Sequence, residues 1–159
     1  MELSDDNVDT KIIEEAIGYS FTDSRLLNRS LTRKAYANEH RQQNRDSEDQ
    51  EIFRTLGDAV LKTILVDRLI ESGCKTREEI TNKKMELESE EGLAKISREL
   101  GIAPFIKLGI GEKKQKANEK QYVLAETLEA IIGAIYLDGG YDASKKTVIK
   151  WLGSQDLII

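Results

Sequence analysis

Cysteine and histidine, which disulfides, zinc sites and many catalytic triads require, are scarce in this chain. One cysteine, Cys74, cannot form an internal disulfide, and one histidine, His40, cannot supply a zinc site or a histidine-based catalytic triad. Any bound metal would therefore need oxygen ligands. No apolar run approaches the roughly 18 residues of a membrane helix, and no charged-then-apolar leader is present. These absences predict a cytoplasmic protein without membrane contact, and the single cysteine agrees with a reducing compartment.

The sequence also lacks the alternating pattern of a β-strand and contains one proline. Apolar residues repeat instead at intervals of three and four, which predicts an all-α fold. Its 159 residues predict a single domain, 1–159. The net charge of −5 argues against binding nucleic acid by bulk charge, so any RNA contact must be local.

Helix boundaries can be predicted from capping residues and from breaks in the apolar pattern. Asp9 and either Thr22 or Asp23 are candidate N-caps, and Gly101 is a candidate C-cap. A polar stretch at 40–50 predicts a loop, and one segment is either two helices or one helix broken near Ser89. The helical segments expected are 9–21, 22–39, 51–71, 76–101, 121–140 and 141–153.

Two of these segments, 51–71 and 121–140, are apolar around most of their circumference and should lie at the centre of a helical bundle. Gly57 sits inside the first of them at a cost of about 1 kcal/mol relative to alanine. Another backbone or side chain is therefore expected to approach closely at this position.

Both central segments carry acidic residues at helical spacing. Glu51, Arg54 and Asp58 share one face in "EIFRTLGDAVLK", and Glu126 and Glu129 share a face in the second segment. If the helices lie side by side, the carboxylates converge and offer the hard oxygen ligands that Mg²⁺ or Mn²⁺ prefers. Such a site would support phosphodiester hydrolysis. The alternative is that these acids point into solvent at the ends of core helices.

Four blocks, in order and spanning roughly residues 9–152, resemble the ribonuclease III family. "EIFRTLGDAVL" is similar to the family signature N-E-R-L-E-F-L-G-D, and "VLAETLEAIIGAIYLDGG" is similar to the second block, I-L-A-D-x-x-E-A-L-I-G-A-I-Y-L-D-G-G. "GYSFTDSRLLNRSLTRKAYANE" and "GLAKISRELGIAPFIKLGIGE" resemble the opening block and the block that ends L-x-L-G-x-G-E. The order of four blocks makes the resemblance highly specific.

The resemblance implies a ribonuclease III endonuclease-domain-like helical bundle that forms a homodimer and accepts double-stranded RNA. It implies Asp58, Glu126, Glu129 and Glu51 as catalytic residues. Asp58, Glu126 and Glu129 would be ligands of Mg²⁺ or Mn²⁺, with Glu51 supporting the site. The chain resembles short members of the family without a double-stranded-RNA-binding domain. Such members are either RNA-processing enzymes or inactive relatives within ribosomes or other ribonucleoproteins.

Several positions depart from the family pattern. Arg54 stands at the second signature glutamate, which is a metal ligand in the family, Glu126 replaces the second-block aspartate, and Arg33 replaces a histidine. A guanidinium flanked by Glu51 and Asp58 could neutralise the acidic cluster without metal. Two hypotheses follow: a metal-dependent endoribonuclease, or a non-catalytic RNA- or ribonucleoprotein-binding homologue.

Local basic residues are the candidates for RNA contact. They lie in two stretches, and ordinary solvated side chains are the alternative interpretation. The residues predicted to touch RNA are Lys113, Lys114, Lys116, Arg33 and Lys34. The apolar tail "DLII" could contact the domain or a partner, and the sequence does not decide between them.

Overall fold

The computed structural model describes residues 2–154, and the "DLII" tail lies outside the described residues. Helices make up almost all of the ordered secondary structure in residues 2–154, and the one pairing of β type there is an isolated bridge between Thr32 and Lys107. The prediction of an all-α fold is confirmed. The helices are α1 (Glu2–Ile17), α2 (Ser24–Ser30), α3 (Lys34–Gln42), α4 (Glu51–Glu71), α5 (Arg77–Leu87), α6 (Glu90–Leu100), α7 (Ile110–Lys114) and α8 (Gln121–Ser154), with short 3₁₀ turns at Ala103–Phe105 and Ala117–Glu119.

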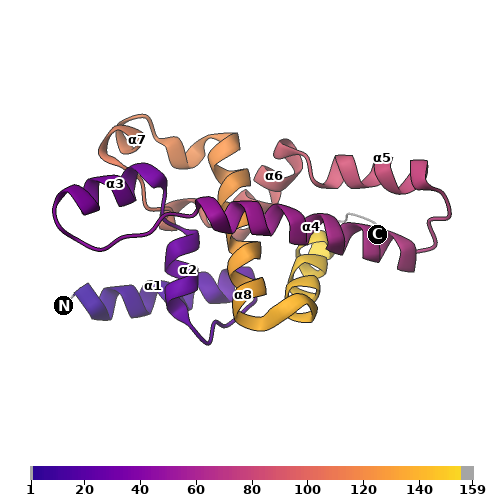
Figure 1. The fold of residues 1–159 in the computed structure, drawn as a ribbon, viewed down its shortest axis with the longest axis horizontal. Coiled ribbons are helices and arrows are strands. Elements are labelled where there is room, and N and C mark those ends of the chain that lie inside the picture. Colours follow the sequence, from indigo (N-terminus) through magenta and orange to yellow (C-terminus); the bar gives the residue numbers. More distant parts are fainter. Residues whose placement is uncertain (1, 155–159) are drawn as a thin grey trace.

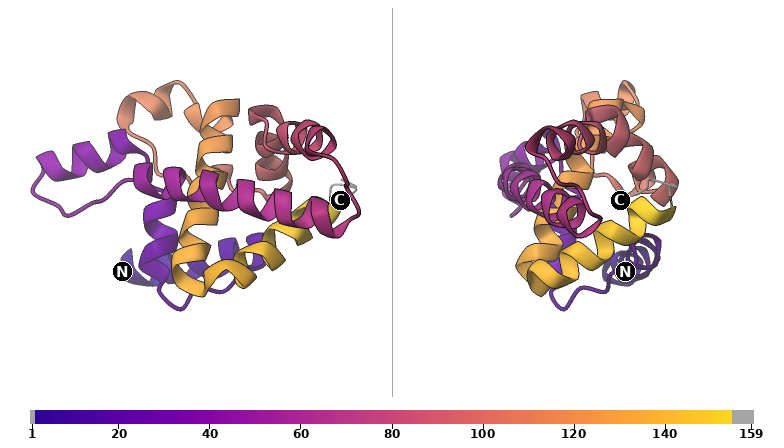
Figure 2. Two further views of the ribbon diagram at one scale, coloured as in Figure 1. Left: turned by 45° about the vertical axis from the view of Figure 1, so that its right-hand side comes forward. Right: turned by 90° about the vertical axis from the view of Figure 1, so that its right-hand side faces the viewer.

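Two long helices, α4 and α8, cross at the centre of the molecule (Figure 1). The crossing is close because glycine lies on both sides: a Cβ on Gly57 would overlap the carbonyl oxygen of Glu129, and a Cβ on Gly133 would overlap that of Phe53. The predicted close approach at Gly57 is confirmed. Helix α8 bends at Gly140, whose φ of 84° lies outside the helical region, and its last part runs back to the C-terminal end of α4 (Figure 2).

The hydrophobic core surrounds this crossing. Apolar residues of α1, α2, α4, α5, α6 and both parts of α8 form one buried cluster, in which α2, α4 and α6 each contact α8. The side chains with almost no exposure are Ile13, Ile17, Leu27, Ile64, Leu65, Leu69, Ile102, Leu124, Leu128, Ile131, Ile132 and Ile135. The two central helices predicted from the sequence therefore form the core, and they carry the acidic residues of interest on a rigid frame.

The outer face of α4 is less buried than predicted. The sequence places this helix at the centre of the bundle, but Ile52 and Ile70 on it have exposed fractions of 61% and 58%. Ala59 and Thr63 lie between them on the same stripe and are also exposed. One side of α4 therefore presents an apolar surface to solvent.

Several helix boundaries differ from the prediction: the first helix ends at Ile17 and not at 21, and α3 runs to Gln42, into the predicted loop. Helix α1 begins at Glu2, so Asp9 lies inside it and is not its N-cap. The segment 22–39 is not one helix but two, because Arg33 N–H donates to Lys107 O and Lys107 N–H donates to Leu31 O, which ends α2.

Three other boundary predictions are confirmed. Asp23 caps α2, Ser89 begins α6 after a break, and Gly101 ends α6 with a left-handed φ of 72°. None of the helices within residues 2–154 combines the length and apolar character needed to span a membrane.

Candidate active site

Acidic side chains from α4 and α8 meet at the crossing of the two helices. Glu51 and Asp58 project from α4, and Glu126 and Glu129 project from α8. The four carboxylates do not form one cluster. Glu51 and Glu126 share the guanidinium of Arg54, whereas Asp58 and Glu129 interact with each other, which lowers the pKa of Asp58 and raises that of Glu129. The site therefore has two halves, named here the Glu51–Glu126 half and the Asp58–Glu129 half.

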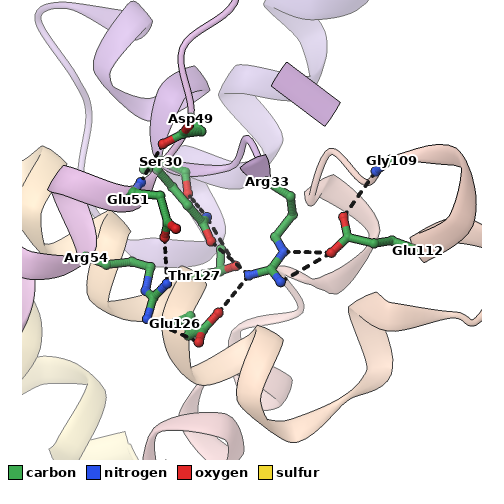
Figure 3. A network of polar contacts seen from close by, with 10 residues as sticks. Ser30, Arg33, Asp49, Glu51, Arg54, Gly109, Glu112, Glu126 and Thr127 are labelled. Carbon is green, nitrogen blue, oxygen red and sulfur yellow. Dashed lines mark hydrogen bonds and ion pairs between the residues drawn. The ribbon is translucent and has the colours of Figure 1, made fainter. Parts of the chain in front are cut away.

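Arg54 lies inside the Glu51–Glu126 half (Figure 3). Its Nη1 is 2.6 Å from Glu51 Oε2, and its Nη2 is 3.1 Å from Glu126 Oε2. Its Nε is buried and has no acceptor among the described residues. Arg54 thus bridges the two helices by two charge-assisted hydrogen bonds.

A second guanidinium, that of Arg33, reaches the same carboxylate. Arg33 Nη1 is 2.7 Å from Glu126 Oε1, and Nη2 is 3.2 Å from Glu112 Oε2 (Figure 3). The Arg33 side chain is only 13% exposed. Burial acts to lower the pKa of Arg33, but the hydrogen bond to Glu126 and the charges of Glu112 and Glu126 outweigh burial and leave the pKa raised. Each carboxylate oxygen of Glu126 therefore contacts one guanidinium group, Oε1 that of Arg33 and Oε2 that of Arg54.

Gln50 supports Arg33 from the residue that precedes α4. Its Oε1 accepts a hydrogen bond from Arg33 Nη1 at 3.3 Å, and its Nε2 donates to Ser30 O at 2.7 Å. Gln50 is 1% exposed, so its amide belongs to the core as well as to the site. Sequence reasoning missed Gln50 and Glu112, and the available signal for Gln50 was its place directly before Glu51 in the signature block.

The Asp58–Glu129 half contains two carboxyl groups and a lysine. Lys62 Nζ lies 2.7 Å from Asp58 Oδ1 and 3.7 Å from Glu88 Oε2. Burial, followed by the hydrogen bond to Asp58 and its charge, raises the pKa of Glu129 to about 7. Burial also acts to raise the pKa of Asp58, but hydrogen bonds with Lys62 and Glu129 outweigh it and leave the pKa lowered. At neutral pH Asp58 is therefore ionised, and Glu129 is partly protonated.

The two halves differ in how well they suit a divalent ion. Asp58 and Glu129 suit one better, because Lys62 contacts only Oδ1 of Asp58, Asp58 is 47% exposed, and Mg²⁺ is often held by one or two carboxylates plus water and phosphate. Glu51 and Glu126 do not fit one, because guanidinium groups take their oxygens. Among residues 2–154, no three acidic, histidine or cysteine side chains are placed to share an ion.

The expected convergence of three or four carboxylates is therefore corrected to a pair. The alternative interpretation, acids pointing into solvent from the ends of core helices, is also wrong, because these groups contact one another at the helix crossing. The physical basis of the division is ion pairing: Arg54 pairs with Glu51 and Glu126, whereas Lys62 pairs with Asp58.

Of the basic residues predicted to touch RNA, the lysines are exposed to solvent and the arginine is not. Lys113, Lys114 and Lys116 are exposed in and after α7, and Lys34 is exposed at the start of α3, which contacts α7. Arg33 instead points inward to Glu112 and Glu126. The exposed lysines lie next to the acidic site, since Glu112 of α7 is a partner of Arg33.

Fold and site together define an all-helical protein with paired carboxylates where two core helices cross. The family model described as "Ribonuclease-III-like" matches residues 23–155, and this chain belongs to that family.

Curated relatives named ribonuclease 3 align with most of the chain. The protein of Oleidesulfovibrio alaskensis is 38% identical over 144 residues, which are 90% of this chain and 62% of the relative. That of Pseudothermotoga lettingae is 37% identical over 139 residues, which are 86% of this chain and 58% of the relative. The chain thus spans about six tenths of the length of these relatives.

Solved structures of the nuclease domain of ribonuclease III from Campylobacter jejuni have the same fold. One, described in connection with flexibility in the region involved in dimer formation, has a TM-score of 0.83 at 28% identity and covers 92% of this chain and 98% of its own. A second has a TM-score of 0.81 at 28% identity and covers 94% of this chain and 97% of its own. These structures confirm the endonuclease-domain-like bundle.

Proposed function

We propose that this chain is an endoribonuclease of the ribonuclease III type, which cleaves double-stranded RNA in cytoplasmic RNA processing as a homodimer. The observation that carries the proposal is the Asp58–Glu129 pair, held at the crossing of α4 and α8 with the pKa of Glu129 raised to about 7. Members of the family generally depend on a divalent metal, and the pair is the part of this site that suits one.

The repulsion between the carboxylates of Asp58 and Glu129 favours the binding of a cation between them. Two carboxyl groups that share a half-buried position repel each other when both are ionised, so one of them keeps a proton until a cation replaces it. When bound by Asp58 and Glu129, Mg²⁺ or Mn²⁺ would activate water and stabilise the charge that develops on the phosphate. Lys62, which donates to Asp58 at 2.7 Å, fixes the orientation of that carboxylate. Glu51, predicted to support the site, contacts Arg54 in this structure.

The homodimer is supported by the exposed apolar stripe on α4. Ile52 and Ile70 lie more than half exposed on the helix that carries Asp58. Such a surface on a core helix is suited to contact with a second copy of the chain. The similar nuclease domain from Campylobacter jejuni has a region involved in dimer formation.

Contact with RNA is assigned to the exposed lysines near the site. Lys34, Lys113, Lys114 and Lys116 surround the end of the molecule where α3 and α7 meet. Because the whole chain is acidic, with a net charge of −5, binding would depend on this local group and weaken steeply with salt.

A second candidate is a non-catalytic homologue that binds RNA or a ribosomal or other ribonucleoprotein component. The observation that favours it is the guanidinium of Arg54 between Glu51 and Glu126, where the resemblance places a metal ligand. In this candidate the lysines still contact RNA, and the acidic site has a structural role.

Cleavage of a labelled RNA duplex by purified protein with Mg²⁺ or Mn²⁺ tests the first candidate. We expect the wild-type protein to cut the duplex and Glu129→Gln to abolish cutting. Glu99→Gln is the matched control, because Glu99 is exposed on α6 and the chemical change is the same. An intact duplex that is nonetheless bound, at high protein concentration and with either metal, would refute the endonuclease and favour the second candidate.

A further inference from the structure

We propose that Arg33, Glu126 and Arg54 act as one unit, in which two guanidinium groups permanently take the place of a divalent ion in the Glu51–Glu126 half of the site. The inference deepens the proposed function and rests on it, since it concerns the other half of the same site. It predicts at most one divalent ion for each chain, at Asp58 and Glu129.

Geometry joins the three residues through a single carboxylate. Glu126 accepts Arg33 at Oε1 and Arg54 at Oε2, over 2.7 Å and 3.1 Å, and Arg54 continues to Glu51 (Figure 3). The side chains of Arg33, Arg54 and Glu126 are 13%, 33% and 24% exposed, so water screens these contacts only in part. No other carboxylate in the described part of the site contacts two arginines in this way.

The charges match those of a bound divalent ion. Arg33 and Arg54 bring two positive charges to the three carboxylates of Glu51, Glu112 and Glu126. A guanidinium keeps its proton at any ordinary pH, and its planar fork suits carboxylate oxygens. The positive charge in this half is therefore part of the polypeptide and does not depend on metal concentration.

Three separate departures from the family pattern meet in this unit. The resemblance places a histidine at position 33, a glutamate at position 54 and an aspartate at position 126, and the structure brings all three positions into contact. The additional methylene of Glu126 gives its carboxylate the reach to contact α4 on one side and Arg33 on the other. Removing one arginine would leave a partly buried carboxylate without its counter-charge, which is strongly unfavourable. The three residues therefore depend on one another.

Metal binding measured in a Glu129→Gln background tests this half alone. The change removes one ligand of the proposed metal pair, so cleavage activity is not a readout and the inference is separated from the proposed function. In this background we compare three proteins by calorimetric titration with Mn²⁺ and by thermal unfolding in EDTA and in Mn²⁺. The first protein carries no further change. The second carries Arg54→Glu, and the third carries Arg33→His, Arg54→Glu and Glu126→Asp together.

We expect no Mn²⁺ binding without a further change, and one new Mn²⁺ ion for each chain in at least one of the other two proteins. The unfolding midpoint of that protein should fall in EDTA and rise by about 5–10 °C when Mn²⁺ exceeds Kd a hundredfold. A protein that folds only with Mn²⁺ also supports the inference. Lys95→Glu is the matched control, since Lys95 is exposed on α6 and the charge change is the same.

Two results would overturn the inference. One is Mn²⁺ binding in the background protein that is lost on Glu126→Gln, which would mean that a metal binds beside the arginines. The other is the absence of any new Mn²⁺ binding or Mn²⁺-dependent folding in both the Arg54→Glu and the triple variant.

Discussion

Gly57 of α4 and Gly133 of α8 lie backbone against backbone where the two helices cross. A Cβ at either position would overlap a carbonyl oxygen of the opposite helix. Asp58 directly follows Gly57, and Glu129 lies one turn before Gly133. The close approach of the two backbones therefore sets the distance at which the two carboxyl groups face each other.

Replacing Gly57 should disrupt this crossing. For Gly57→Ala we expect a loss of about 3 kcal/mol in the free energy of unfolding, because the helices must separate to admit the methyl group. Urea denaturation followed by circular dichroism measures the loss. Gly111→Ala is the control: Gly111 is helical, and a Cβ there would meet nothing within 4 Å. Equal stability of the two variants would contradict the close contact.

The carboxylate of Asp138 should make stability depend on pH. It accepts hydrogen bonds from Tyr19 O–H at 2.6 Å and from the N–H groups of Thr22 and Asp23 at 2.9 Å. Burial acts to raise the pKa of Asp138, but these hydrogen bonds outweigh it and hold the pKa below the usual 3.8. Because the pKa is lower in the folded state, the stabilisation is present above about pH 4 and lost as pH falls through the folded pKa.

We therefore expect Asp138→Asn to lower the free energy of unfolding by about 1–2 kcal/mol at pH 7 and to differ less from wild type below pH 4. Thermal unfolding across this pH range measures the difference. Asp142→Asn, at an exposed position in the next turn, should change little at any pH. A constant difference between Asp138→Asn and wild type from pH 7 to pH 3 would exclude the titration of Asp138 as its source.

The apolar stripe on α4 should control self-association. We expect Ile52→Glu combined with Ile70→Glu to convert a dimer into a monomer, because the substitutions place charge on the proposed contact surface. Sedimentation velocity measures the change in mass. Ile110→Glu is the control, since Ile110 is 62% exposed but lies on α7, away from this stripe. A dimer that survives the double substitution would place the interface elsewhere.

Interactions between residues close in sequence were enough to predict many of the helix boundaries. The bounds of α4, the cap at Asp23 and the break at Ser89 follow from apolar periodicity and from side chains that satisfy free backbone N–H groups. The end of α2 could not be predicted in this way. It depends on hydrogen bonds with Lys107, more than 70 residues further along the chain.

Some features of the site likewise follow from local sequence, and others depend on tertiary contacts. The sequence by itself determined the central helices, the four acidic positions and the glycine at the crossing, because each follows from spacing within one helix. Only the tertiary structure decided which carboxylates share a partner. It placed Arg33 and Arg54 on Glu126, and it left Asp58 with Glu129, because ion pairing depends on three-dimensional distance and burial.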